Sequence, residues 1–203
     1  PSVMYVGTEP GEVYKSTDAG ATWNSVSQNT QVDGGVTAVA VDPNDPNIVL
    51  AGAGWSLKRS SDGGNTWNTV INATNLYPNE IQFNPAQSNI VLAATDAGLY
   101  RSTDGGINFT QLNSEKSWDI KFKPGNPNTA YNVRRNSSLV RPEFFISTDA
   151  GLTWTLRDNG WYTSSDPARN AEGARIAVSP ADSNRIYAYL IGEAKANDVG
   201  FIG

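Results

Sequence analysis

Carboxylates are the side chains through which this sequence could do acid–base chemistry, because its 203 residues include no histidine and no cysteine. That composition excludes Ser-His-Asp and Cys-His nucleophilic chemistry and metal sites built from these residues. Asp18, Asp62, Asp104 and Asp149 recur at intervals of 44, 42 and 45 residues (18 to 62 to 104 to 149). Four similar copies cannot all lie in one active site, so turn formation is favoured over catalysis for these aspartates.

Each of these aspartates lies in an octet with the pattern Ser-x-Asp-x-Gly-x-Thr-Trp, and Asn-Phe replaces Thr-Trp in the third copy. An Asp carboxylate can accept bonds from backbone N–H groups further along a turn, and Gly supplies a positive φ. The octets therefore predict β-hairpins, with the aromatic residues buried between neighbouring sheets. The octet residues are Ser16, Asp18, Gly20 and Trp23; Ser60, Asp62, Gly64 and Trp67; Ser102, Asp104, Gly106 and Phe109; and Ser147, Asp149, Gly151 and Trp154.

A second repeat lies between the octets and reads as a strand, a Pro/Asn/Asp turn and another strand. One period then holds four strands, for example 36–41, 48–53, 57–60 and 66–70, which is the pattern of a propeller blade. The Asp42–Asp45 turn lacks the Gly and Glu of a calcium-binding EF-hand loop, and we predict no metal site and no cofactor. The fold class predicted is all-β. The predicted blades are 36–70, 79–112 and 117–157, with partial blades at 3–26 and 175–202.

The octets resemble the Asp-box, or BNR repeat, of the β-propellers found in sialidases, xyloglucanase-type glycoside hydrolases and sortilin/Vps10 receptors. The resemblance implies that residues 1–203 are a segment of one larger propeller domain, of about seven blades. The rest of that propeller is then expected to be a partner of this chain. Because the family includes both enzymes and receptors, the resemblance indicates the fold more strongly than the function.

Two connections depart from the repeat, and loops that differ between repeats are where function is expected. One holds about six extra residues, with Arg134, Arg135 and Arg141, and the other holds Trp161 and Tyr162. In a propeller both would lie on one face, opposite the Asp-box turns. Arginines beside exposed aromatic residues would suit a carboxylate-bearing glycan or a polar protein surface. The alternative is that both loops pack locally and bind nothing.

A possible catalytic carboxylate is suggested by resemblance alone. In xyloglucanase-type enzymes an aspartate in a Thr-Asp-x-Gly setting is catalytic, and Thr95-Asp96-Ala97-Gly98 is similar. The sequence identifies no second carboxylate for a hydrolase, which would need a pair. The resemblance to sialidases is weaker, because Arg175-Ile176 is followed by Ala177 instead of proline and there is no set of three separated arginines.

The function that the sequence favours is an extracellular or cell-surface module that binds a glycan or a protein without catalysis. The alternatives are a xyloglucanase-like glycoside hydrolase and a structural repeat region of a large surface protein. The net charge of −5 argues against nucleic-acid binding, and the longest apolar runs, about six residues, are too short to insert into a membrane. The absence of cysteine and the abundance of Asn, Thr, Ser and Gly are typical of many bacterial secreted proteins.

Overall fold

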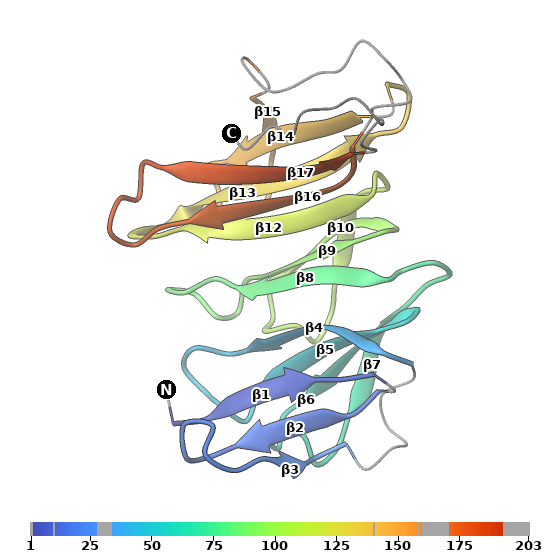
Figure 1. Cartoon of the computed structure of the whole chain (residues 1–203), viewed down its shortest axis with the longest axis vertical. Coiled ribbons are helices and arrows are strands. Elements are labelled where there is room, and N and C mark those ends of the chain that lie inside the picture. Colours follow the sequence, from blue (N-terminus) through green and yellow to red (C-terminus); the bar gives the residue numbers. More distant parts are fainter. Residues whose placement is uncertain are drawn as a thin grey trace, which may run out of the picture.

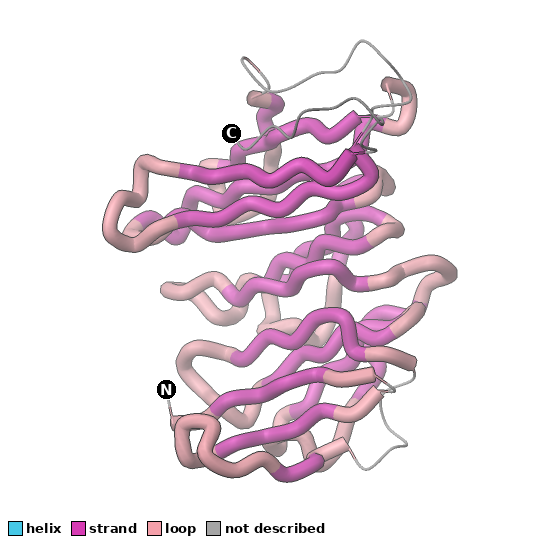
Figure 2. Tube along the Cα trace, in the orientation of Figure 1, coloured by secondary structure: helices cyan, strands magenta, loops and turns pink. Residues whose placement is uncertain are grey.

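The computed structural model describes residues 2–9, 11–27, 34–139, 141–157, 159 and 171–192, without the side chains of residues 171, 172, 191 and 192. Every regular element in this part of the chain is a β-strand (Figures 1 and 2). None of the described segments forms a helix that is long and apolar enough to cross a membrane.

The strands form five antiparallel sheets, and we name them blades 1 to 5 in chain order. Blades 2, 3 and 4 are four-stranded, which confirms the predicted all-β fold of four-stranded antiparallel blades. Blade 1 contains β1 (Met4–Gly7), β2 (Val13–Ser16) and β3 (Asn24–Ser25); blade 2 contains β4 (Val36–Val41), β5 (Val49–Ala53), β6 (Ser56–Ser60) and β7 (Asn68–Asn72); blade 3 contains β8 (Pro78–Phe83), β9 (Val91–Thr95), β10 (Gly98–Ser102) and β11 (Thr110–Asn113); blade 4 contains β12 (Ser117–Lys123), β13 (Asn126–Asn136), β14 (Arg141–Ser147) and β15 (Thr155–Leu156); and blade 5 contains β16 (Ala171–Val178) and β17 (Ile186–Gly192).

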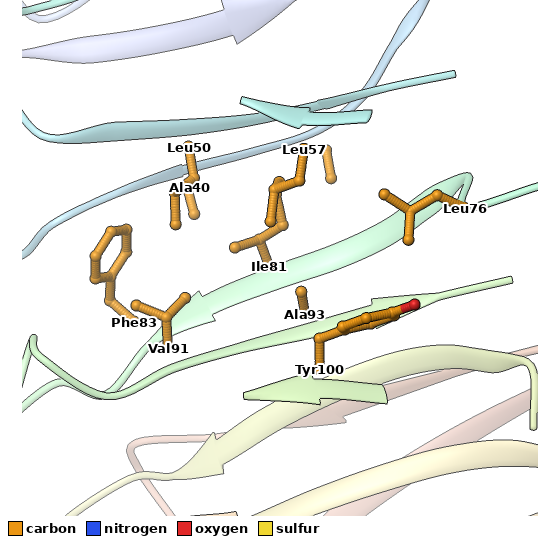
Figure 3. Close-up of a cluster of buried hydrophobic side chains, with 10 residues drawn as sticks. Ala40, Leu50, Leu57, Leu76, Ile81, Phe83, Val91, Ala93 and Tyr100 are labelled. Carbon is orange, nitrogen blue, oxygen red and sulfur yellow. The ribbon is translucent and has the colours of Figure 1, made fainter. Parts of the chain in front are cut away.

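The blades pack face to face in chain order, and β4, β8, β12 and β16 follow one another along one edge of the stack (Figure 1). We call these the inner strands, because the first strand of each blade lines the channel of a propeller. A hydrophobic cluster fills each gap between blades. Figure 3 shows the cluster between blades 2 and 3, where Leu50 and Leu57 face Ile81, Phe83 and Val91. Burial on both faces explains why β5 and β9 are apolar without alternation.

The inner strands β4, β8 and β12 each contain a register shift, which leaves Thr37, Asn79 and Trp118 as extra residues in bulges. The hydroxyl of Thr37 donates a hydrogen bond to the carbonyl of Pro78 (2.5 Å), and Nδ2 of Asn79 donates to the carbonyl of Ser117 (2.9 Å). Both acceptors belong to the first residue of the next inner strand. The bulges therefore connect successive blades at the channel edge.

A second connection between blades uses the residue that precedes the Asp-box serine in blades 2 and 3. Nε of Arg59 donates a hydrogen bond to the carbonyl of Gly105 (2.9 Å) in the next blade. Nε of Arg101 likewise donates to the carbonyl of Ala150 (3.1 Å). Lys15 and Ile146 occupy this position in blades 1 and 4.

The Asp-box aromatic residues pack toward the blade that precedes their own. Trp67, Phe109 and Trp154 are partly buried against the hydrophobic clusters between blades 1 and 2, 2 and 3, and 3 and 4. Trp23 is 37% exposed, so the prediction that all four are buried is wrong at this position. The physical reason is that no described sheet precedes blade 1 and packs against Trp23.

The extra residues of the connection in blade 4 lengthen a hairpin instead of forming a separate loop. Strands β13 and β14 span 11 and 7 residues, whereas β9 and β10 in blade 3 span 5 each. The register continues to Asn136 and Arg141, so the hairpin extends beyond its counterparts in the other blades. The pairing of β13 with β14 therefore determines the positions of Arg134, Arg135 and Arg141.

Candidate ligand-binding site

The four Asp-box aspartates are bound within their own turns. In the second copy, Thr66 donates to Asp62 Oδ1 from its backbone N–H (2.9 Å) and to Oδ2 from its hydroxyl (2.6 Å). Ser60 donates its hydroxyl to Oδ1 of Asp62 (2.8 Å) and accepts from the N–H of Gly64 (2.8 Å). The same bonds recur in the first and fourth copies. In the third copy the side-chain amide of Asn108 replaces the threonine hydroxyl as the donor to Oδ2 of Asp104. This geometry leaves the aspartates little capacity for a ligand.

These hydrogen bonds lower the pKa of all four aspartates from the usual 3.8 to about 2. For Asp18 and Asp62 the largest cause is the bond from the threonine hydroxyl. For Asp104 and Asp149 desolvation is the largest single influence and raises the pKa, but the combined bonds from the backbone and side chains outweigh it. Bonds to the charged form thus hold these carboxylates ionised.

Because the pKa of each aspartate is lower in the folded state than in the unfolded state, the free energy of unfolding depends on pH in the acid range. The contribution of each aspartate is complete above the unfolded value of 3.8 and is lost as the pH falls through the folded value of about 2. We expect the free energy of unfolding, measured with urea, to fall between about pH 4 and about pH 2. The Asp62→Asn variant should be less stable at neutral pH and show a shallower decline. An undiminished decline in that variant would contradict this role for Asp62.

The three arginines of the β13–β14 hairpin have different environments. The guanidinium of Arg134 lies over the ring of Phe145, 3.5 Å from its centroid, and burial lowers the pKa of Arg134. Arg141 forms an ion pair with the buried Glu143 (NH2 to Oε1, 3.3 Å). The side chain of Arg135 makes no hydrogen bond or ion pair with the described residues. Arg134 and Arg141 are therefore engaged within the hairpin, whereas Arg135 is not. The predicted partners of these arginines, Trp161 and Tyr162, lie outside the described residues.

Asp96 occupies the turn between β9 and β10, and both of its carboxylate oxygens are held by neighbours. Oδ1 accepts a hydrogen bond from Nδ2 of Asn79 (2.8 Å), and Oδ2 accepts from Nζ of Lys116 (2.7 Å). Asp96 and Lys116 both remain partly exposed. Arg175 joins them from β16, because its NH1 donates to the carbonyls of Trp118 (2.9 Å) and Asn79 (3.3 Å).

We call Asn79, Asp96, Lys116 and Arg175 the mouth cluster. Blade 3, blade 5 and the connection between β11 and β12 contribute to it. It lies at the end of the channel where second strands turn into third strands and fourth strands lead to the next blade. We call this end the loop face, and the opposite end the Asp-box face. Polar side chains that converge from separate elements are typical of a ligand site.

The other inner-strand carboxylates whose side chains the structure describes, Glu80 and Asp119, are paired. Oε1 of Glu80 accepts a bond from Nζ of Lys121 (2.6 Å), and the same ammonium lies 3.1 Å from Oδ1 of Asp119. Asp119 is buried, and its Oδ2 accepts from the backbone N–H of Ile176 (2.8 Å). Both carboxylates are therefore held by Lys121.

Two exposed aromatic residues, Trp55 and Tyr77, adjoin the mouth cluster and were not among the residues predicted to bind. They are 51% and 43% exposed, respectively, and Tyr77 has a positive φ of 35°. The N–H of Tyr77 donates to the carbonyl of Gly54 (2.9 Å), and the N–H of Asp96 donates to the carbonyl of Tyr77 (3.2 Å). The backbone therefore connects the Trp55 turn, Tyr77 and Asp96 in sequence along the loop face. The feature of the sequence that could have identified Trp55 and Tyr77 is that each is an aromatic residue in a turn instead of a strand.

Comparison with known proteins indicates the same fold. The family model described as "Sortilin, neurotensin receptor 3" matches residues 11–116, and the BNR/Asp-box repeat model matches residues 145–156. No curated protein matches the chain.

Several solved structures resemble the whole chain. An ancestral GH74 enzyme is 23% identical with a TM-score of 0.68, and the match covers 98% of this chain and 29% of that one. The GH74 enzyme of Niastella koreensis is 22% identical with a TM-score of 0.70, over 91% and 31% of the two chains. YCF48 bound to D1 peptide is 17% identical with a TM-score of 0.60, over 95% and 58%. At these identities the likeness shows the β-propeller fold alone.

The present chain spans about a third of the length of the GH74 enzymes, which are thus much larger proteins. The sortilin model, by contrast, covers residues 11–116, which is more than half of the 203 residues. The chain belongs to the sortilin/Vps10 family of Asp-box β-propellers.

Proposed function

We propose that this chain is a non-catalytic binding module of an extracellular or cell-surface β-propeller, and that a glycan or protein ligand binds at the mouth cluster on the loop face. The observation that carries the proposal is the convergence of Asn79, Asp96, Lys116 and Arg175 from blade 3, blade 5 and the connection between β11 and β12. On the Asp-box face, the carboxylates accept hydrogen bonds from residues of their own turns, as Asp62 does from Thr66.

The chemistry of the loop face suits a ligand that has both polar groups and flat apolar surfaces. The Asp96–Lys116 pair offers an acceptor and a donor side by side, and both side chains are accessible to solvent. Trp55 and Tyr77 supply large apolar areas with few rotatable bonds, which is typical of binding surfaces. The similar structures include glycoside hydrolases and a propeller bound to a peptide, and both types are consistent with a ligand at this face.

The proposal is tested by removing the aromatic surface nearest to Asp96. The ligand is first identified on a glycan array or by direct protein binding. We expect Tyr77→Ala to lower the affinity for it roughly tenfold, because tyrosine is enriched among the few contact residues whose truncation costs more than about 1 kcal/mol. Ile107→Ala is the control, since Ile107 is also exposed (53%, against 43% for Tyr77) but lies in an Asp-box turn. An equal loss of affinity in both variants, or no loss of affinity in Tyr77→Ala, would show that the ligand does not bind at the mouth cluster.

A glycoside hydrolase is the second candidate, and the observation that favours it is the fixed, partly exposed carboxylate of Asp96 on the loop face. The pairing of Glu80 and Asp119 with Lys121 opposes it, because a hydrolase needs a second active carboxylate. Incubation with xyloglucan distinguishes the two functions. Product release by the wild-type chain that Asp96→Asn abolishes would establish the hydrolase, whereas binding without products supports the module.

We also propose that further blades of the same propeller cover the outer face of blade 5. Tyr187 and Tyr189 on β17 are 59% and 68% exposed. The register places them opposite the same inner-strand positions as Tyr131 and Val133 of blade 4, which are 4% and 0% exposed between blades. Aromatic side chains at positions that are buried in the other blades are consistent with a packing surface for another blade.

A further inference from the structure

Arg175 is the residue of the mouth cluster that reaches furthest across the blades. It lies in β16, yet its NH1 donates to the carbonyl of Trp118 in β12 (2.9 Å) and to the carbonyl of Asn79 in β8 (3.3 Å). The side chain is exposed despite these two bonds. Two backbone acceptors from two other blades thus fix the orientation of an accessible guanidinium.

The bonds to NH1 leave one complete edge of the guanidinium available. Nε and NH2 of Arg175 make no hydrogen bond with the described residues, and no carboxylate in the described part of the chain lies within ion-pair distance. The parallel N–H groups of Nε and NH2 match the two oxygens of a carboxylate, which arginine binds in a bidentate manner. A preoriented edge of this kind lowers the entropy cost of binding.

The carboxylates around Arg175 that the structure describes are bound by other cations or amides. Asp96 is bound by Lys116 and Asn79. Glu80 and the buried Asp119 share Lys121. Among the residues whose side chains the structure describes, the positive charge of Arg175 therefore has no carboxylate partner, whereas Lys116 and Lys121 each have one.

We infer that Arg175 binds the carboxylate of a uronate-containing oligosaccharide. This inference rests on the proposed function and names the ligand class of the same site. The carboxylate occupies the Nε–NH2 edge, and hydroxyls of the neighbouring sugar interact with Asp96 and Lys116. Tyr77 offers a face for stacking of a sugar ring. A glycan is favoured over a peptide because the paired donor and acceptor beside an aromatic ring match adjacent sugar hydroxyls and the apolar face of the ring.

The test is calorimetric binding of two oligosaccharides that differ only at the carboxyl group. The probes are tetragalacturonate and the same oligosaccharide with its carboxyl groups reduced to alcohols. We expect Arg175→Ala to weaken binding of tetragalacturonate about tenfold or more, because it removes a charge-assisted bidentate contact. The affinity of Arg175→Lys should lie between those of the wild type and Arg175→Ala, since lysine keeps the charge but not the paired donors. The reduced oligosaccharide should bind more weakly and should not respond to Arg175→Ala.

The controls separate this inference from a folding defect and from the proposed function. Arg185→Ala removes an exposed arginine from the same blade and should leave binding unchanged, and thermal unfolding should show that every variant is folded. Equal affinity of the wild type for the two probes, no binding of either, or no effect of Arg175→Ala overturns the inference. Glycan binding that Tyr77→Ala weakens and Arg175→Ala does not would overturn it while the proposed function stands. Preferential binding of a peptide with a free terminal carboxylate through Arg175 would overturn the glycan class.

Discussion

Truncation of Leu92 to alanine is expected to lower the free energy of unfolding by about 3–5 kcal/mol. Leu92 is fully buried between blades 3 and 4, in a cluster that also contains Ile120 and Phe122. Its methyl groups lie against Gly151 of the Asp-box in blade 4, so a cavity would open between two sheets that cannot collapse independently. Chemical unfolding followed by tryptophan fluorescence measures the change. Leu139→Ala, at the exposed tip of the β13–β14 hairpin, is the control and should alter stability by less than about 0.5 kcal/mol.

The contact with Gly151 gives this prediction a second test. A Cβ added at Gly151 would lie 2.6 Å from Cδ2 of Leu92, and the φ of +82° disfavours any residue other than glycine. Gly151→Ala should therefore destabilise the wild type. It should cost less in the Leu92→Ala background, where only the backbone strain remains. Strictly additive losses in the double variant would show that the two residues do not pack against each other.

Trp154→Ala is expected to cost about 2–4 kcal/mol, whereas Trp23→Ala should cost less than about 1 kcal/mol. Both tryptophans occupy the same octet position and donate Nε1–H to the carbonyl of the octet glycine (3.1 and 3.0 Å). They differ in that Trp154 packs against the cluster between blades 3 and 4, while Trp23 is exposed. The comparison thus isolates packing between blades from the hydrogen bond within the turn.

Urea unfolding of the two variants measures this difference. Trp67→Ala offers a third point, because Trp67 is partly buried against the cluster between blades 1 and 2. The decrease in the free energy of unfolding caused by Trp67→Ala should be closer to that of Trp154→Ala than to that of Trp23→Ala. Equal losses at Trp23 and Trp154 would mean that the tryptophans act within their own turns and contribute nothing between blades.

The blades could be predicted from the sequence because their determinants are local. The Ser, Asp and Thr of an octet find their partners within eight residues, so the pattern Ser60-x-Asp62-x-Gly64-x-Thr66 already specifies the turn. Asn108 in the third copy donates from its amide to Asp104 Oδ2 as the threonine hydroxyl does elsewhere, which explains why that replacement is tolerated. Short-range chemistry of this kind does not depend on how the blades are stacked.

The candidate site was harder to predict because it depends on register and on contacts between blades. The sequence grouped Arg134, Arg135 and Arg141 as binders, but the pairing of β13 with β14 places Arg134 over Phe145 and Arg141 on Glu143. No pattern within one repeat relates the bulge residue Asn79 to Asp96 of its own blade.

Arg175 illustrates the same limit over a longer range. Its partners, the carbonyls of Trp118 and Asn79, are 57 and 96 residues away in the chain. These distances follow from the stacking of three inner strands. A single sequence therefore identifies Arg175 as a basic residue in a strand and gives no indication of where its guanidinium lies.

The connections between blades have a consequence for how such a chain can evolve. Thr37, Arg59, Asn79 and Arg101 all donate to backbone carbonyls of the next blade. A carbonyl is present whatever side chain its residue carries, so each repeat can attach to a neighbour whose sequence has diverged. A gene segment that encodes one repeat can then be duplicated, deleted or exchanged, and the new junction will find its acceptors in place. Propellers built in this way can lengthen or shorten by whole repeats while their loop faces diversify.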